Sequence, residues 1–211
     1  MFVTFEGPEG SGKTSAANEV IRILVARGYD VLYTREPGGT PIAEEIRNII
    51  LDKKNTALDA RAEALLYAAS RRQHLIEKVW PALKEGKIVI SDRFLDSSLA
   101  YQGAARKIGI ENVLNINLFA TEGTFPDLTL LFDITPEKGL ERIAINKKRE
   151  VNRLDLEALE FHRQVRETFL ELAKKYQERY VVIDASKTLP EVVGVALNVI
   201  LDRLEQKHAR L

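Results

Sequence analysis

Residues 7 to 14 form a glycine-rich run, Gly-Pro-Glu-Gly-Ser-Gly-Lys-Thr, that matches the pattern G-x-x-x-x-G-K-[ST]. Its glycines let backbone N–H groups wrap around a phosphate chain. Lys13 supplies a mobile positive charge, and the Thr14 hydroxyl can ligate magnesium at the positive end of a helix. The run therefore predicts a binding site for the phosphates of a nucleoside triphosphate, built from Gly7, Pro8, Glu9, Gly10, Ser11, Gly12, Lys13 and Thr14.

A carboxylate and a guanidinium group follow a second short apolar run, Ile88 to Ser91. They belong to Asp92 and Arg93. In open α/β sheets, ligands bind at the carboxyl ends of the strands. We therefore expect Asp92 to hold or orient magnesium together with Thr14, beside the triphosphate. Arg93 is a candidate for stabilising negative charge there, whereas a lone arginine is as often part of a surface ion pair.

Short β-branched or aromatic runs alternate with longer segments of helical periodicity, which is typical of repeated βα units. The sequence predicts an α/β fold, with a five-stranded parallel sheet covered by helices on both faces, in one domain of 211 residues. The predicted strands are Phe2 to Glu6, Val31 to Thr34, Ile88 to Ser91, Leu128 to Phe132 and Val181 to Asp184. The clearest predicted helices are Lys13 to Arg27, Ala57 to Glu85 with an interruption near Pro81, and Asp155 to Glu178.

The composition restricts the classes of partner. The chain has 31 Lys plus Arg and 31 Asp plus Glu residues, so no global field draws it to nucleic acid or anionic lipid. It has no cysteine, which removes disulfides and thiolate metal sites and suits a reducing compartment. Its longest charge-free stretches, Asn112 to Thr121 and Val192 to Leu201, are half as long as the roughly 20 residues that span a bilayer. We expect a cytoplasmic protein that binds neither nucleic acid nor membranes.

Glycine-rich phosphate loops of this kind (P-loops) occur in switch GTPases, nucleic-acid motors and small kinases. A switch GTPase needs an Asn-Lys-x-Asp run, and the nearest candidate, residues 146 to 149, ends in Arg149 instead of aspartate. A motor normally has a longer chain or a basic face. A small kinase must hold a phosphorylated acceptor and stabilise charge on the transferred phosphoryl group. Arginines suited to that task are abundant in the first half of the chain: Arg35, Arg47, Arg71, Arg72 and Arg93.

Tyr67 and Arg71 lie four residues apart on one side of a predicted helix. The ring could stack on a base while the guanidinium reaches its edge, or the pair could be a core tyrosine with a nearby surface arginine. Two classes of function stay open on these residues. One is a kinase for some nucleoside monophosphate, and the other is a nucleotide-dependent switch protein.

Several motifs in order along the chain resemble those of the thymidylate kinases. They are GPEGSGKT at 7 to 14, TREPGG at 34 to 39, LLYAASRR at 65 to 72, SDRFLDSSLAYQG at 91 to 103, PDLTLLFD at 126 to 133 and NRLD at 152 to 155. The resemblance covers essentially the full length. It implies a nucleoside monophosphate kinase fold, a homodimer, and magnesium-dependent transfer of the γ-phosphoryl group of ATP to dTMP, giving dTDP and ADP.

The resemblance also implies roles for individual residues. Lys13, Asp92 and Arg93 would be catalytic, and Arg47 and Arg93 would grip the monophosphate. Tyr67 would stack on thymine and Tyr101 would lie against the deoxyribose. The acceptor residues as a set would be Glu9, Glu36, Arg47, Tyr67, Arg71, Arg93, Ser98, Tyr101 and Gln102.

The polar segment at residues 146 to 153 matches the lid of the family, although alone it reads as a solvated turn. The P-loop has no arginine, and its lysine is that of the motif itself, so the resemblance to the bacterial type implies a catalytic arginine in the lid. Arg149 and Arg153 are the candidates. Asn152 stands where many relatives carry aspartate, which leaves open which of the two acts. Adenine should lie near Ala185 to Lys187 and Arg142.

Overall fold

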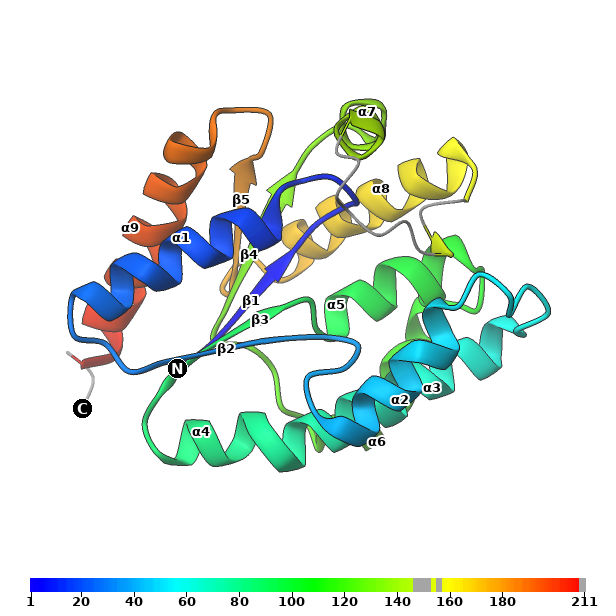
Figure 1. Cartoon of the computed structure of the whole chain (residues 1–211), viewed down its shortest axis with the longest axis horizontal. Helices are drawn as coiled ribbons and strands as arrows, with labels where there is room; N and C mark the ends of the chain where they lie inside the picture. The colour runs from blue at the N-terminus through cyan, green and yellow to red at the C-terminus, as the bar shows by residue number, and fades with distance from the viewer. Residues whose placement is uncertain (146–152, 155–156, 209–211) are drawn as a thin grey trace.

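The computed structural model describes residues 1–145, 153–154 and 157–208, and Figure 1 shows one sheet with helices on both sides. The strands are hydrogen-bonded in the order β2-β3-β1-β4-β5, and every neighbouring pair is parallel. They are β1 (Phe2–Glu6), β2 (Val31–Arg35), β3 (Ile88–Asp92), β4 (Leu128–Asp133) and β5 (Tyr180–Asp184). The first has the predicted bounds and each of the others is one residue longer than predicted. The predicted α/β class and parallel sheet are therefore confirmed.

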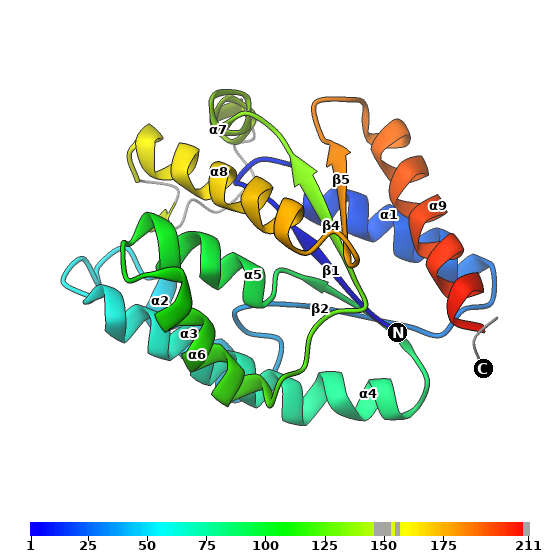
Figure 2. The same cartoon turned by 180° about the vertical axis from the view of Figure 1, so that it is seen from behind.

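Alternate residues of the central strands supply two apolar cores. Phe5 of β1 packs with α1 and α9 on one face of the sheet, whereas Phe2 packs with the helices on the opposite face. Figures 1 and 2 show α1 (Lys13–Ala26) and α9 (Leu189–His208) side by side on the first face. The other described helical segments are α2 (Pro41–Leu51), α3 (Ala60–His74), η1 (Leu75–Val79), α4 (Trp80–Lys84), α5 (Leu95–Ser98), η2 (Leu99–Ala105), α6 (Ile110–Thr121), α7 (Pro136–Ile145) and α8 (Leu159–Lys175).

The predicted helix from Ala57 to Glu85 differs from the structure at its start and in its middle. It begins at Ala60 because the Asp59 side chain caps it, accepting hydrogen bonds from the N–H groups of the next turn at 2.9 and 3.1 Å. The predicted interruption is the π-helical segment η1, which ends two residues before Pro81. Pro81 then occupies the first turn of α4, which continues η1 without a break.

The helix predicted from Asp155 to Glu178 is shorter in the structure, because α8 spans Leu159–Lys175. Asp155 itself lies outside the described residues. At the other end, Tyr176 has φ −119 and ψ 48, which is not helical. Helical periodicity extended the prediction past both ends because the flanking residues continue the apolar spacing.

All of the strands end on a charged residue at the same edge of the sheet: Glu6, Arg35, Asp92, Asp133 and Asp184. The P-loop leaves this edge at its centre, directly after β1. The chain crosses to one side of β1 to form β2, and later to the other side to form β4, so the strand order reverses direction beside β1. Such a point in an open parallel sheet is where ligands bind. None of the helices in the described ranges combines the length and apolar character that a membrane span requires.

Candidate active site

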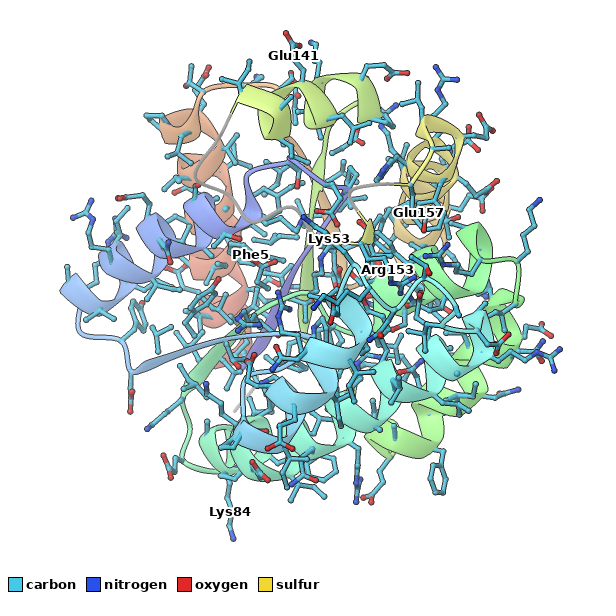
Figure 3. The ribbon with its side chains drawn as sticks, turned by 45° about the vertical axis from the view of Figure 1, so that its right-hand side comes forward. Phe5, Lys53, Lys84, Glu141, Arg153 and Glu157 are labelled. Carbon is cyan, nitrogen blue, oxygen red and sulfur yellow. The ribbon has the colours of Figure 1, made fainter. Side chains whose placement is uncertain are left out.

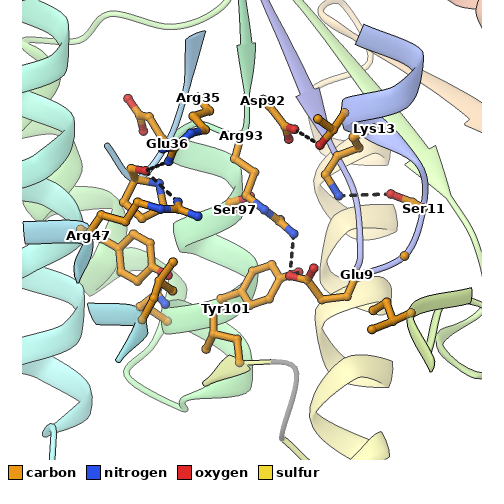
Figure 4. Close-up of a pocket in the computed structure, with 18 of the residues that line it drawn as sticks. Glu9, Ser11, Lys13, Arg35, Glu36, Arg47, Asp92, Arg93, Ser97 and Tyr101 are labelled. Carbon is orange, nitrogen blue, oxygen red and sulfur yellow. Dashed lines mark hydrogen bonds and ion pairs between the residues drawn. The ribbon is translucent and has the colours of Figure 1, made fainter. Parts of the chain in front are cut away.

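A cavity of about 1090 Å³ opens at this edge, between the P-loop and the segments that follow β2 and β3 (Figure 4). The predicted site residues in its wall are Glu9, Gly10, Ser11, Gly12, Lys13, Thr14, Glu36, Arg47, Tyr67, Asp92, Arg93, Tyr101 and Gln102. The wall also contains Arg35, Pro37, Asn48, Ser97 and Arg142. The fold thus joins the P-loop, the ends of β2 and β3, and residues of α1, α2, α3, α5, η2 and α7 around one space.

Lys13 begins α1, and its ammonium group lies within the P-loop. Nζ donates to the carbonyl oxygens of Gly7 at 2.9 Å and Pro8 at 3.0 Å, and to Ser11 Oγ at 3.1 Å. Burial, followed by the nearby Arg93, lowers the pKa of Lys13 to about 8. A bound phosphate would raise this pKa again, because an adjacent anion favours the charged form. An anion bound in the loop would therefore favour the charged form of Lys13.

Glycines let the P-loop make its closest contacts. Gly12 has φ 81 directly before α1, a left-handed conformation that side chains disfavour. A Cβ atom on Gly10 would lie 2.0 Å from the carbonyl oxygen of Gly139, and one on Gly139 would lie 2.3 Å from that of Glu9. Helix α7 therefore rests directly on the backbone of the loop. This contact brings Arg142 to the wall of the cavity.

Arg142 also contacts the loop that follows β5. Its Nη1 donates to the carbonyl oxygen of Ala185 at 2.9 Å. The structure therefore brings together the two segments that the sequence associates with adenine. The adenine site itself stays a prediction.

Thr14 meets Asp92, which Figure 4 labels, beside the P-loop. Thr14 Oγ1 donates to Asp92 Oδ2 at 2.6 Å. Hydroxyl and carboxylate oxygens are ligands that Mg²⁺ accepts, and magnesium at nucleotide sites usually has few protein ligands besides phosphates and water. Over the described ranges, no group of three or more His, Asp or Glu side chains forms a metal cage. The pair fits a metal that arrives with a nucleotide.

Arg93 links the P-loop to η2. Its Nη2 lies 2.7 Å from Glu9 Oε1, and its Nη1 donates to Ser97 Oγ at 3.0 Å. The Tyr101 hydroxyl donates to the same Glu9 oxygen at 3.1 Å, and the guanidinium carbon lies 4.9 Å from the centre of the tyrosine ring. Burial raises the pKa of Tyr101, so its hydroxyl keeps the proton that it donates. Arg93 neutralises an acidic side chain that would otherwise repel phosphate.

Two more arginines converge on another part of the wall. The Nη1 atoms of Arg35 and Arg47 both donate to the carbonyl oxygen of Pro37, at 3.2 and 2.9 Å. Arg35 also pairs with Glu44 at 2.9 Å. With Arg93, the cavity therefore has guanidinium groups from three separate segments, which suits a phosphorylated ligand.

Arg71 lies behind the wall, with only 1% of its surface exposed. Its Nε donates to Glu36 Oε2 at 2.7 Å, and its Nη2 donates to the Phe94 carbonyl at 2.9 Å. Its Nη1 contacts Ser98 Oγ at 3.1 Å and the side-chain oxygen of Asn117. These contacts use four of the five N–H groups of the guanidinium.

Glu36 is held from both sides. Its Oε1 lies 2.9 Å from Nδ1 of His74, and its Oε2 accepts from Arg71. The other ring nitrogen of His74 lies 2.6 Å from Thr34 Oγ1. Glu36 is thus a fixed carboxylate at the end of β2, and His74 has a structural partner on each side of its ring.

The chain matches the family model described as Thymidylate kinase over residues 5–194. It is 57% identical to thymidylate kinase from Geobacillus sp. (strain WCH70), over 97% of each chain, and 58% identical to the enzyme from Bacillus velezensis, over 98% of this chain and 97% of that one. A crystal structure of thymidylate kinase from Ehrlichia chaffeensis has a TM-score of 0.75 and 32% identity, covering 95% of this chain and 98% of the other. The chain belongs to the thymidylate kinase family. It is an enzyme with the nucleoside monophosphate kinase fold.

Most site residues predicted from the resemblance to thymidylate kinases meet at the one cavity, but Arg71, Ser98, Gly7 and Pro8 are not in its wall. The first two contact each other behind the acceptor side, so only a small part of Arg71 faces toward a ligand. The roles assigned to all of these residues stay predictions.

The predicted lid at residues 146 to 153 is described only at Arg153, and Arg149 lies outside the described residues. Arg153 lines a second, smaller cavity of about 300 Å³ together with Lys53 and Glu157, which Figure 3 shows near it. Its side chain contacts Glu63, and its Nε donates to the Ile50 carbonyl at 3.1 Å. The structure therefore does not bring Arg153 to the P-loop.

Sequence reasoning missed the carboxylate that ends β1. Glu6 Oε1 accepts from the Phe94 N–H at 2.8 Å, and Glu6 Oε2 accepts from Ser97 Oγ at 2.5 Å. Burial, with Asp96 nearby, raises the pKa of Glu6 to about 8. Glu6 therefore fixes the turn that carries Arg93. Its place at a strand end directly before the P-loop was an available signal. Glu6 was counted only as the last residue of the predicted strand.

Proposed function

We propose that this enzyme transfers the γ-phosphoryl group of ATP to dTMP, giving dTDP and ADP, a step toward dTTP. The observation that carries the proposal is one cavity that joins a P-loop to guanidinium groups of Arg35, Arg47 and Arg93. A switch protein needs the loop but has no need of acceptor-side arginines. The family of the chain and its 57% identity to a thymidylate kinase support the same reaction.

The P-loop amides and Lys13 would hold the phosphates of ATP, and Thr14 with Asp92 would hold or orient Mg²⁺. The metal supplies neutralisation of charge on the phosphates when it is bound. The acceptor phosphate is already a nucleophile at neutral pH, so positioning and electrostatic stabilisation suffice. Arg93 lies between the P-loop and the acceptor side, where it could contact the transferred group. No general base is required.

On the acceptor side, Arg47 and Arg93 would bind the monophosphate of dTMP. Glu9 would accept from the 3′-hydroxyl of the sugar, which gives a reason for an acid inside a phosphate-binding loop. Tyr101 donates to Glu9 at 3.1 Å and would lie against the deoxyribose, where a 2′-hydroxyl would be crowded. Tyr67 would stack on the base, and Gln102 would read its edge. Arg71, Ser98 and Glu36 would support this pocket from behind.

The lid arginines stay part of the proposal. Arg149 or Arg153 would approach the transferred phosphoryl group when the lid closes, which would also exclude water. Arg153 would have to leave Glu63 to do so. This requirement favours Arg149 as the residue that reaches the phosphates.

We also propose a homodimer. Apolar side chains stand exposed on α2, α3 and α6, which Figure 1 shows side by side: Ile49 is 49% exposed, Leu65 56% and Phe119 89%. A second copy of the chain would cover them. The lack of cysteine suits a reducing compartment, so a cytoplasmic site of action completes the proposal.

The test is release of ADP from MgATP with a panel of acceptors, namely dTMP, dUMP, UMP, CMP, AMP and GMP. We expect release that depends on dTMP, with less from dUMP and ribonucleotides near background. Release with a different acceptor would keep the kinase and replace the base assignment. Release with none of them would favour the nucleotide-dependent switch protein.

A further inference from the structure

Glu63 is a buried carboxylate on α3 to which the proposed reaction gives no role. Only 1% of the residue is exposed. It lies four residues before Tyr67 and eight before Arg71, so all three side chains are on one face of the helix. Its Oε1 accepts from Gln102 Nε2 at 2.8 Å and from Arg106 Nε at 3.4 Å, and its Oε2 contacts Arg153.

The helices α3 and α5–η2 face each other through two matched polar contacts. Arg71, near the end of α3, contacts Ser98, and Glu63, near its start, contacts Gln102. On each side, the two contacting residues belong to helical segments, which fix the distance between them. Of the two residues of the second segment that make these contacts, Gln102 lies in the cavity wall, to which Tyr67 also belongs, and Ser98 does not.

Glu63 determines which end of the Gln102 amide faces the ligand. A carboxylate paired with arginines only accepts hydrogen bonds, so the amide must turn its NH₂ group toward it. The amide carbonyl oxygen then points away from Glu63. Within the described ranges, the hydrogen bond that the Gln102 side chain makes is the one through Nε2, which leaves this oxygen for a ligand.

We propose that Glu63 is a positioning residue for base selection, because it locks Gln102 with its carbonyl oxygen toward the base. Thymine and uracil carry a hydrogen on N3, which this oxygen can accept. Cytosine has a bare lone pair at N3, and two acceptors would then face each other without a proton. The lock therefore favours 4-oxo pyrimidines over 4-amino pyrimidines. This inference rests on the proposed function, in which Gln102 reads the edge of the base.

The test is the ratio of kcat/KM for dTMP to kcat/KM for dCMP, in the full chain and in Glu63→Gln. The variant keeps the size of the side chain but can donate as well as accept, so the Gln102 amide is free to turn. We expect the ratio to fall about tenfold or more, the size of effect that follows when one buried hydrogen bond is left unmade. The KM for ATP should not change. The ratio of dTMP to dUMP should also stay constant, because both bases carry a hydrogen on N3.

Two controls separate base selection from a general structural role. Arg106→Ala removes one partner of Glu63 and keeps the contact with Gln102, so its dTMP-to-dCMP ratio should match that of the unmodified chain. In a Gln102→Ala background, adding Glu63→Gln should not change the ratio further, because the residue through which Glu63 acts is gone. A purely structural effect would instead add to that of Gln102→Ala.

Should Glu63→Gln fail to fold by circular dichroism, Glu63→Asp replaces it, since aspartate keeps the charge for the arginines but withdraws the carboxylate from Gln102. The inference is overturned if a folded Glu63 variant keeps the dTMP-to-dCMP ratio of the unmodified chain. It is also overturned by equal shifts in the dUMP and dCMP ratios. Failure of the proposed function has a different signature, which is no dTMP-dependent release of ADP from the unmodified chain.

Discussion

At the scale of single residues, buried carboxylates surround a cavity that is suited to polyanions. Glu6, Glu9, Glu36 and Glu63 are all at most 8% exposed. The last three are each within 2.9 Å of, or in direct contact with, an arginine. Burying such pairs adds little to stability, because the loss of hydration offsets their attraction. Their effect is positional: each acid fixes a side chain or turn that faces the ligand.

Burial and Asp96 raise the pKa of Glu6 to about 8, with Arg93 and the Ser97 and Phe94 hydrogen bonds acting the opposite way. The folded chain therefore holds the proton more tightly than the unfolded chain, whose glutamate has its ordinary value of 4.5. The stability from this group is complete below that value and is lost as the pH rises toward 8. We predict that Glu6→Gln, which cannot ionise, loses less unfolding free energy between pH 5 and pH 8 than the unmodified chain, by at least about 1 kcal/mol.

The measurement is urea unfolding of both proteins at several pH values. The exposed Glu141→Gln is the control, and its curve should run parallel to that of the unmodified chain. Parallel curves for Glu6→Gln as well would show that Glu6 is ionised throughout, and would contradict the prediction.

The sequence predicts which residue types meet at the cavity. It does not predict which of them face a ligand and which are bonded to other parts of the protein. Lys13, Thr14 and Asp92 follow from a motif and a strand end, both of which have local signatures. Arg71 looked like a ligand-facing residue, yet its partners are Glu36, Ser98, Asn117 and Phe94. Those partners come from three separate segments, so no local pattern in the sequence brings them together. Glu63 had one usable signal, its spacing of four residues from Tyr67.

At the scale of elements, the contact between the P-loop and α7 depends on two glycines. A Cβ on Gly139 would lie 2.3 Å from the Glu9 carbonyl oxygen, which is backbone and cannot swing away. We predict that Gly139→Ala moves α7 away from the loop, raises the KM for ATP about tenfold and lowers the melting temperature. Helix propensity alone predicts the reverse sign, since alanine stabilises a helix interior by about 0.5–1 kcal/mol relative to glycine.

Gly194→Ala is the matched control, because Gly194 lies within α9 and a Cβ there meets nothing within 4 Å. It should be neutral or slightly stabilising, with an unchanged KM for ATP. Steady-state kinetics and thermal melting distinguish the two variants. Two glycine variants with the same behaviour would mean that α7 does not need the close approach.

Element boundaries were predictable where a glycine turn or a strand pattern marks them. Gly12 and the strand ends lie within one residue of the predicted positions, because turn and strand signals are local. The start of α3 depends on the cap at Asp59, and the π-helical segment η1 lies between α3 and α4 in one continuous helical run. Periodicity carries no signal for either feature, since apolar spacing continues through both.

At the scale of the whole molecule, the parallel order of the strands brings the ends of β1, β2 and β3 to one edge. This arrangement was predictable, because buried β-branched runs separated by helices have few alternatives. It also explains how a chain with a formal net charge of +0 can bind nucleotides. The fold brings Lys13, Arg35, Arg47 and Arg93 to the wall of one cavity at this edge.

The exposed apolar side chains on α2, α3 and α6 are the remaining feature at this scale. Phe119 is 89% exposed, so its ring contributes little to the core of one chain, while exposing such area to water costs roughly 25 cal/mol per Å². We predict that Phe119→Lys converts a dimer into a monomer at micromolar concentration, measured by light scattering, with little change in the circular dichroism spectrum.

Val25→Lys, on α1 at 53% exposure, is the matched control and should remain dimeric, because α1 covers the opposite face of the sheet. A dimer that survives Phe119→Lys would place the contact elsewhere, and a monomeric unmodified chain would remove the homodimer from the proposal. Because α3 carries Glu63, Tyr67 and Arg71 on its inner side, a contact over its outer side would also stiffen the helix that positions the base.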